Sequence, residues 1–83
     1  MAAFFLDSSA LVKRYVQETG TTWVRTLTHR RTAHQIFLAR ITAVEVTAAV
    51  ARRRKGGSLT ATRVRSILTR FRSHLAGRYI AVE

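Results

Sequence analysis

The sequence has no cysteine, and this absence excludes a disulfide framework and any metal site built on thiolates. It has no apolar run that approaches the roughly 20 residues needed to cross a membrane, and its first apolar residues lack the basic lead-in of a signal peptide. From these absences we expect a soluble, cytoplasmic protein without a membrane partner.

Acidic side chains are scarce as well. The sequence has 15 Lys and Arg residues and a formal net charge of +11, and its only acids are Asp7, Glu18, Glu45 and Glu83. A basic excess of this size attracts polyanions. Most of the basic residues are Arg, whose planar fork binds phosphate through two hydrogen bonds and stacks on bases. We therefore expect a nucleic acid as the partner.

Other catalytic motifs are missing. Gly56 and Gly57 lack the lysine and the spacing of a phosphate-binding loop, which argues against an NTPase, and no Gly-x-Ser-x-Gly elbow is present. His29 and His34 lie five residues apart, which does not place two imidazoles on one helix face for zinc. These absences leave the few carboxylates as the candidate catalytic groups.

The length of the chain predicts one domain, residues 1–83, with a small core. A chain of 83 residues buries only about 60 to 65 per cent of the surface of its unfolded state. Its hydrophobic content of 47% is ordinary for a globular protein, which argues against a disordered basic tail.

Short apolar runs predict three buried strands, at residues 3–6, 36–39 and 79–82. Helical spacing predicts two helices before the second strand and two after it, with starts at Ser8 or Ser9, at Thr21 or Thr22, at Thr42 and near Val64. The basic stretch from His29 to His34 reads as a loop.

This order of elements predicts an α/β fold with a parallel sheet, right-handed crossovers and helices on both faces. The helix that follows the second strand is apolar nearly all round, so we expect it to be buried. Trp23 and Phe71 fall on apolar helical stripes, and we expect both in the core.

Two of the acids follow predicted strands. Asp7 comes directly after the first strand, and Glu45 is expected in the first turn of the helix after the second. Because the carboxyl ends of parallel strands share one edge of a sheet, both acids should lie at that edge. Two close carboxylates repel each other, and a divalent cation relieves the repulsion. In so basic a chain, the pair indicates metal-assisted chemistry on a phosphodiester.

Purely structural roles are open for the same acids. Thr42 and Glu45 have the spacing of a capping box, in which the glutamate satisfies a backbone donor, and spacing alone favours this role. Asp7 can be the N-cap of the first helix. Glu18 has no partner at a useful spacing and reads as a surface residue.

The basic run Arg52, Arg53, Arg54 and Lys55 also has two interpretations. It can complement the negative end of the helix dipole and keep the protein soluble. It can also form a groove that follows an RNA backbone, in which case binding weakens steeply with salt. That groove would include four arginines of the last predicted helix, Arg63, Arg65, Arg70 and Arg72.

Two segments resemble a known family: FFLDSSALVKRY at residues 4–15 and ITAVEVTAAVARR at residues 41–53 are similar to the first half of a PIN domain. This is the fold of VapC-type toxin ribonucleases, which belong to toxin-antitoxin pairs. The resemblance implies an RNA-cleaving enzyme that depends on Mg²⁺ or Mn²⁺, with Asp7 and Glu45 as catalytic and metal-binding residues. It also implies that the Ser9 hydroxyl orients Asp7, that the protein forms a homodimer, and that a cognate antitoxin binds it.

PIN domains run beyond this length and add one or two aspartates after the third strand, whereas the sequence has no acid between Glu45 and Glu83. The resemblance therefore implies a partial, three-layer PIN-like domain, truncated after the third strand, in which one copy cannot assemble the usual carboxylate cluster. The strand at residues 3–6 would keep an open apolar edge and associate through it. Family resemblance favours an active toxin-type ribonuclease. The missing acids favour a nonenzymatic remnant that binds RNA or an antitoxin.

Overall fold

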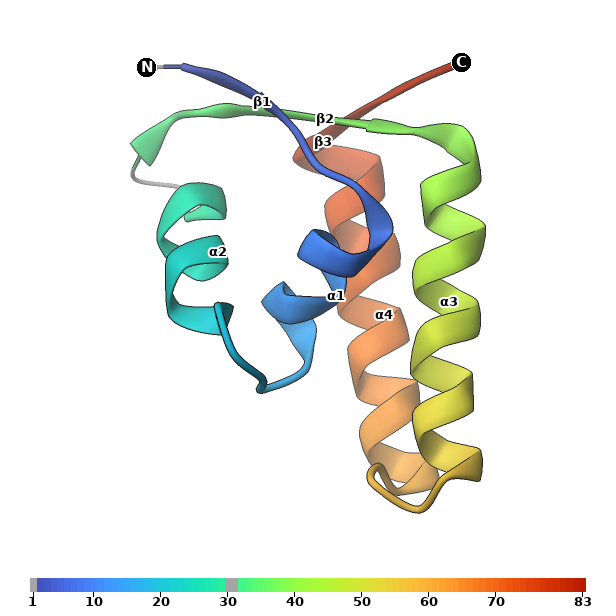
Figure 1. Cartoon of the computed structure of the whole chain (residues 1–83). Coiled ribbons are helices and arrows are strands. Elements are labelled where there is room, and N and C mark those ends of the chain that lie inside the picture. The colour runs from blue at the N-terminus through green and yellow to red at the C-terminus, as the bar shows by residue number, and fades with distance from the viewer. Residues whose placement is uncertain (1, 30–31) are drawn as a thin grey trace.

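The computed structural model of the chain describes residues 2–29 and 32–83 (Figure 1). In these ranges the elements follow the predicted order, and their bounds are β1 (Ala3–Phe5), α1 (Ser8–Tyr15), α2 (Thr21–Thr28), β2 (Gln35–Ala39), α3 (Arg40–Lys55), α4 (Ala61–Gly77) and β3 (Tyr79–Val82). The predicted loop from His29 to His34 includes residues 30 and 31, which lie outside the described residues. No helix in the described ranges is long and apolar enough to cross a membrane.

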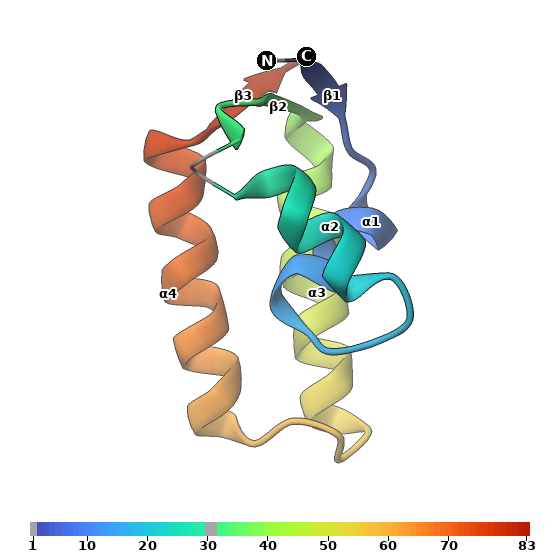
Figure 2. The same ribbon diagram turned by 90° about the vertical axis from the view of Figure 1, so that its left-hand side faces the viewer.

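The sheet has three parallel strands in the order β1-β2-β3, which confirms the predicted α/β class with a parallel sheet. Because this order runs in one direction, right-handed crossovers place every connection on the same side. Figures 1 and 2 show the four helices of the described ranges on one face of the sheet. The sequence predicts helices on both faces, and the described helices cover only one of them.

The opposite face of the sheet is apolar. Phe5, Phe37 and Ile80 are partners in register across the three strands, and Phe5 is 61% exposed. Their neighbours on β2, Ile36 and Leu38, point the other way and are buried under the helices. Strand alternation therefore divides the apolar residues of the sheet between a covered face and an uncovered one.

The core lies between the sheet and the helices. Leu11, Leu38 and Val46 are fully buried there, and Phe71 of α4 joins them, as predicted. Trp23 is 63% exposed, so its predicted place in the core is wrong. The short helix α2 packs through Val24 and Leu27, and Trp23 lies on the face beside that stripe.

Helix α3 is buried on one side and exposed on the other. Val46 and Val50 are fully buried, whereas Ile41 is exposed and Val44 is 63% exposed. The reason is geometric: α3 contacts α1, α4 and β2, and these neighbours cover only one side of it. The expectation of a wholly buried helix is therefore wrong.

Two glycines end α3. Gly57 has a φ of +85°, its N–H donates to the carbonyl of Arg54, and the N–H of Ser58 donates to the carbonyl of Arg53. This pair of bonds is a Schellman motif, which requires a left-handed residue at the position of Gly57.

A buried hydrogen-bond network connects three elements. The hydroxyl of Tyr15 in α1 lies 2.6 Å from Nδ1 of His74 in α4 and 2.5 Å from the hydroxyl of Tyr79 in β3. The ring of Phe71 packs edge-on against Tyr15 at 5.5 Å between centroids. The network therefore ties the last strand to both the first and the last helix.

Candidate functional site

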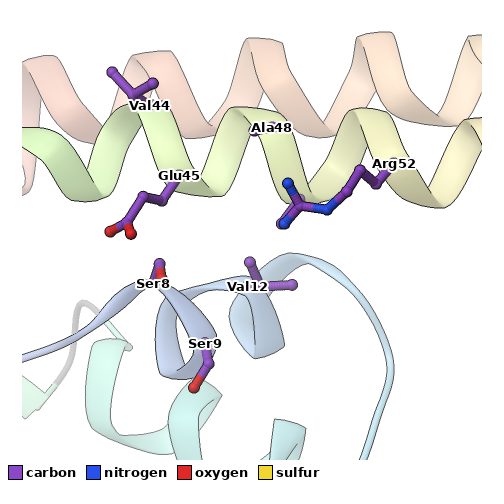
Figure 3. A pocket seen from close by; sticks show the side chains of 8 residues that line it. Ser8, Ser9, Val12, Val44, Glu45, Ala48 and Arg52 are labelled. Carbon is purple, nitrogen blue, oxygen red and sulfur yellow. The ribbon is translucent and has the colours of Figure 1, made fainter.

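A groove of about 340 Å³ separates α1 from α3. Its lining residues come from the first half of α1 and the middle of α3: Ser8, Ser9, Val12, Val44, Glu45, Ala48, Ala49 and Arg52. In Figure 3 the carboxylate of Glu45 and the guanidinium of Arg52 both extend from α3 toward α1. The groove thus receives one negative and one positive side chain from the same helix.

Asp7 stands one residue before the groove wall and caps α1. Its Oδ1 accepts a hydrogen bond from the N–H of Ala10 at 2.9 Å and a longer one from the hydroxyl of Ser9 at 3.4 Å. The structural role as N-cap is therefore confirmed for Asp7 and not for Ser8 or Ser9. Both hydrogen bonds engage the same carboxylate oxygen, so capping does not occupy Oδ2.

Glu45 is not part of a capping box. Helix α3 begins at Arg40, and its N-cap Ala39 has no side-chain hydrogen bond. Thr42 is therefore a residue of the helix and not its cap, and its side chain is buried. The expected first-turn position of Glu45 is likewise wrong, because this residue is the sixth of α3 and lies in the second turn. The helix starts two residues earlier than predicted, and this shift removes the structural explanation for Glu45.

Asp7 and α3 nevertheless lie at the same edge of the sheet. Strands β1 and β2 are parallel neighbours, Asp7 follows β1 closely, and α3 begins directly after β2. The contact between α1 and α3 brings the start of α1 beside the second turn of α3. The predicted meeting of the two segments at the carboxyl ends of the strands is confirmed.

Glu18 is an ion-pair centre and not an unpaired surface residue. Its Oε1 lies 3.3 Å from Nζ of Lys13, and its Oε2 accepts a short hydrogen bond from Arg53. The side chain of Glu18 is only 25% exposed. The pairing fastens the connection after α1 to the last turn of α3, so the sequence interpretation of Glu18 is wrong.

The four basic residues at the end of α3 have different environments. Arg53 is held by Glu18, Arg52 lines the groove, and Arg54 and Lys55 are exposed in the last turn. Within the part of the chain that the structure describes, neither Arg52 nor Glu45 takes part in an ion pair. The groove therefore holds two charges that the rest of the described fold does not neutralise.

The donor set at this edge is made of oxygen atoms. The carboxylates of Asp7 and Glu45 and the hydroxyls of Ser8 and Ser9 are hard ligands of the kind that Mg²⁺ prefers. Across residues 2–29 and 32–83, no group of three or more His, Cys, Asp or Glu side chains gathers. Mg²⁺ is commonly held by one or two carboxylates together with water and substrate phosphates, and oxygen donors of this kind suit that mode of binding.

Two histidines have structural contacts. His34 accepts a hydrogen bond at Nδ1 from the N–H of Ala2 and packs edge-on against Phe4. Burial, with the nearby Arg78, lowers the pKa of His74 from 6.5 to about 4, and burial raises the pKa of Tyr15 and of Tyr79. Sequence reasoning missed this network, because residues so far apart along the chain have no local pattern that marks them as partners.

No protein-family model and no curated protein sequence matches the chain.

Proposed function

We propose that the chain is a metal-dependent ribonuclease of the PIN type that cleaves RNA phosphodiesters in the groove between α1 and α3. The observation that carries the proposal is the placement of Glu45, whose side chain extends into a groove that begins one residue after Asp7. The net charge of +11 supports RNA as the substrate, because arginines and lysines gain affinity by releasing counterions from phosphates.

Each side chain has a distinct task in this proposal. Asp7 and Glu45 would hold Mg²⁺ or Mn²⁺, which when bound activates a water molecule and offsets charge on the phosphate. Asp7 caps α1 through Oδ1 and keeps Oδ2 for the cation, so one residue fixes the helix and serves the site. The Ser9 hydroxyl donates to the same Oδ1 and restricts rotation of the carboxylate.

A three-layer PIN-like architecture is part of the same proposal. In such a fold, further helices cover the sheet face that carries Phe5, Phe37 and Ile80, which the described helices leave open. Association with a second copy of the chain, or with a cognate antitoxin, is another way to bury this face and the open edge of β1.

A second candidate is a nonenzymatic protein that binds RNA. The observation in its favour is that the described residues gather no group of three acids or histidines, so metal binding depends on two carboxylates and on the substrate itself. In this candidate the basic chain binds RNA through its arginines and lysines and does not cleave it.

The deciding experiment is cleavage of single-stranded RNA by the purified chain with Mg²⁺, with Mn²⁺ and with EDTA. Asp7→Asn is the sharpest variant, because asparagine keeps the N-cap while it removes the negative charge. Glu45→Gln removes the second charge, and Glu83→Gln removes one from an exposed residue outside the groove as the matched control.

We expect metal-dependent cleavage by the wild type and by Glu83→Gln, and loss of most of that rate in Asp7→Asn and Glu45→Gln. RNA binding without cleavage under every metal condition, by a folded wild-type chain, would overturn the ribonuclease and support the second candidate.

A further inference from the structure

The four basic residues at the end of α3 have different environments, and only one of them faces the groove. Arg53 is held by Glu18, and its backbone carbonyl accepts the N–H of Ser58 in the turn that ends the helix. The guanidinium of Arg53 is therefore committed to the fold. Arg52 alone of the basic run lines the groove that also receives Glu45.

The positions of Glu45 and Arg52 follow from helix geometry. They are seven residues apart on α3, which is about 20° short of two full turns, so both side chains leave the same face of the helix. Their α-carbons are separated by roughly 10 Å along the axis. Figure 3 shows the two charged groups on the same side of α3, with Ala48 between them and Val12 on the facing wall.

The wall between the two charges is apolar. Val12 is nearly fully buried, and Ala48 and Ala49 complete the surface between the charged side chains. A guanidinium beside such a wall, with no ion pair among the described residues, is suited to a bidentate contact with a phosphate. Glu45 repels a bare phosphate. A cation beside Glu45 at one end of the groove and Arg52 at the other end would each neutralise part of the negative charge of an RNA strand.

We propose that Arg52 holds a backbone phosphate of the bound RNA, next to the phosphate that faces Glu45, while Arg53 holds α3 to the connection between α1 and α2. The inference rests on the proposed function, because it takes RNA as the occupant of the groove. The sequence alone allows any of the four basic residues of the run to contact RNA, whereas the structure places only Arg52 in the groove.

The test is binding of a fluorescently labelled single-stranded RNA in EDTA, where no metal-dependent cleavage takes place, over a series of salt concentrations. One lost phosphate contact lowers the slope of log K against log salt by about 0.7, which is about a 5-fold weaker affinity at about 0.1 M salt. We expect this change for Arg52→Gln. Arg52→Lys should restore most of the slope, because a lysine also neutralises a phosphate, while it loses the bidentate geometry.

The matched control is Arg65→Gln, which removes the same charge from an exposed position of α4 outside the groove lining. We expect a clearly smaller change in slope for this control. Equal losses in Arg52→Gln and Arg65→Gln would overturn the assignment, because net charge alone would then explain the binding. Thermal unfolding of each variant checks that the protein is folded. Because the side chain of Arg52 is exposed, its substitution should leave the unfolding temperature unchanged.

The two proposals fail separately. A reduced slope in Arg52→Gln, in a chain that never cleaves RNA, supports the phosphate contact and overturns the ribonuclease. Metal-dependent cleavage with an unchanged slope in Arg52→Gln supports the ribonuclease and overturns the phosphate contact.

Discussion

Lowering the pH from about 7 to about 4.5 is expected to destabilise the fold through His74. This imidazole is 8% exposed and lies against Tyr15 of α1 and Tyr79 of β3. The other charged groups near it are Arg14 of α1, Arg70 of its own helix and Arg78, and all three oppose its protonation. The hydroxyls of the network can reverse their donors when His74 is protonated, so the cost comes from burying a charge beside cations and not from broken hydrogen bonds.

The pKa of His74 falls from 6.5 to about 4 in the folded state, so the unfolded chain binds the proton more tightly. Stability therefore stays constant with respect to this group above about pH 6.5 and is lost as the pH falls toward about 4. A tenfold difference in proton affinity corresponds to about 1.4 kcal/mol, so the fall of the pKa from 6.5 to about 4 sets an upper bound of about 3.5 kcal/mol on the loss. The side chains of Arg70 and Arg78 are exposed and screened by salt, so we expect about 2 kcal/mol.

The assay is urea unfolding followed by circular dichroism at several pH values, with His74→Gln as the comparison. We expect the free energy of unfolding of the wild type to fall between about pH 6.5 and about pH 4.5, and that of the variant to be nearly flat there. NMR titration of the imidazole gives an independent reading on the wild type alone. A measured pKa of His74 near 6.5 would show that burial beside Tyr15 and Tyr79 does not oppose its protonation.

Three further predictions concern stability and surface. Asp7→Ala should lower the free energy of unfolding by about 1 kcal/mol through the lost N-cap, while Asp7→Asn should leave it almost unchanged in chemical denaturation; equal losses would show that the cap is not the cause. Glu18→Gln should cost about 1 kcal/mol, since its pairs with Lys13 and Arg53 are only partly buried, and the double variant with Arg53→Gln should cost little more than either change alone; additive losses would contradict the pairing. The wild type should bind a hydrophobic dye and self-associate in light scattering, and Phe5→Ser should reduce both effects without loss of stability; a monodisperse wild-type monomer without dye binding would contradict an open apolar face.

The pattern of apolar residues was sufficient to predict the elements and the parallel sheet. Short apolar runs and helical stripes record local periodicity, and the order of strands and helices restricts the connections. The side of the sheet that each helix covers was not predictable in the same way, because it depends on strand order. The exposure of Trp23 and Val44 has the same origin, since a stripe of apolar residues does not state which neighbour covers it.

The meeting of Asp7 with α3 could be predicted from the sequence, whereas the contacts around them could not. Asp7 and α3 meet at one edge of the sheet because both follow neighbouring parallel strands, and this rule needs only the strand assignments. The start of α3 was misplaced by two residues, since Thr42 has the chemistry of a cap while Ala39 does not. The pairs of Glu18 and the contacts of His74 join distant segments, and only the folded chain brings them together.

Binding of Mn²⁺, followed by the EPR signal of the free ion, tests whether Asp7 and Glu45 form one metal site. We expect the wild type to bind Mn²⁺ weakly, and Asp7→Asn and Glu45→Gln each to lose most of this binding. The double variant should bind Mn²⁺ no more weakly than either single variant. Unchanged Mn²⁺ binding in both single variants, with both proteins folded, would show that Asp7 and Glu45 do not form one metal site.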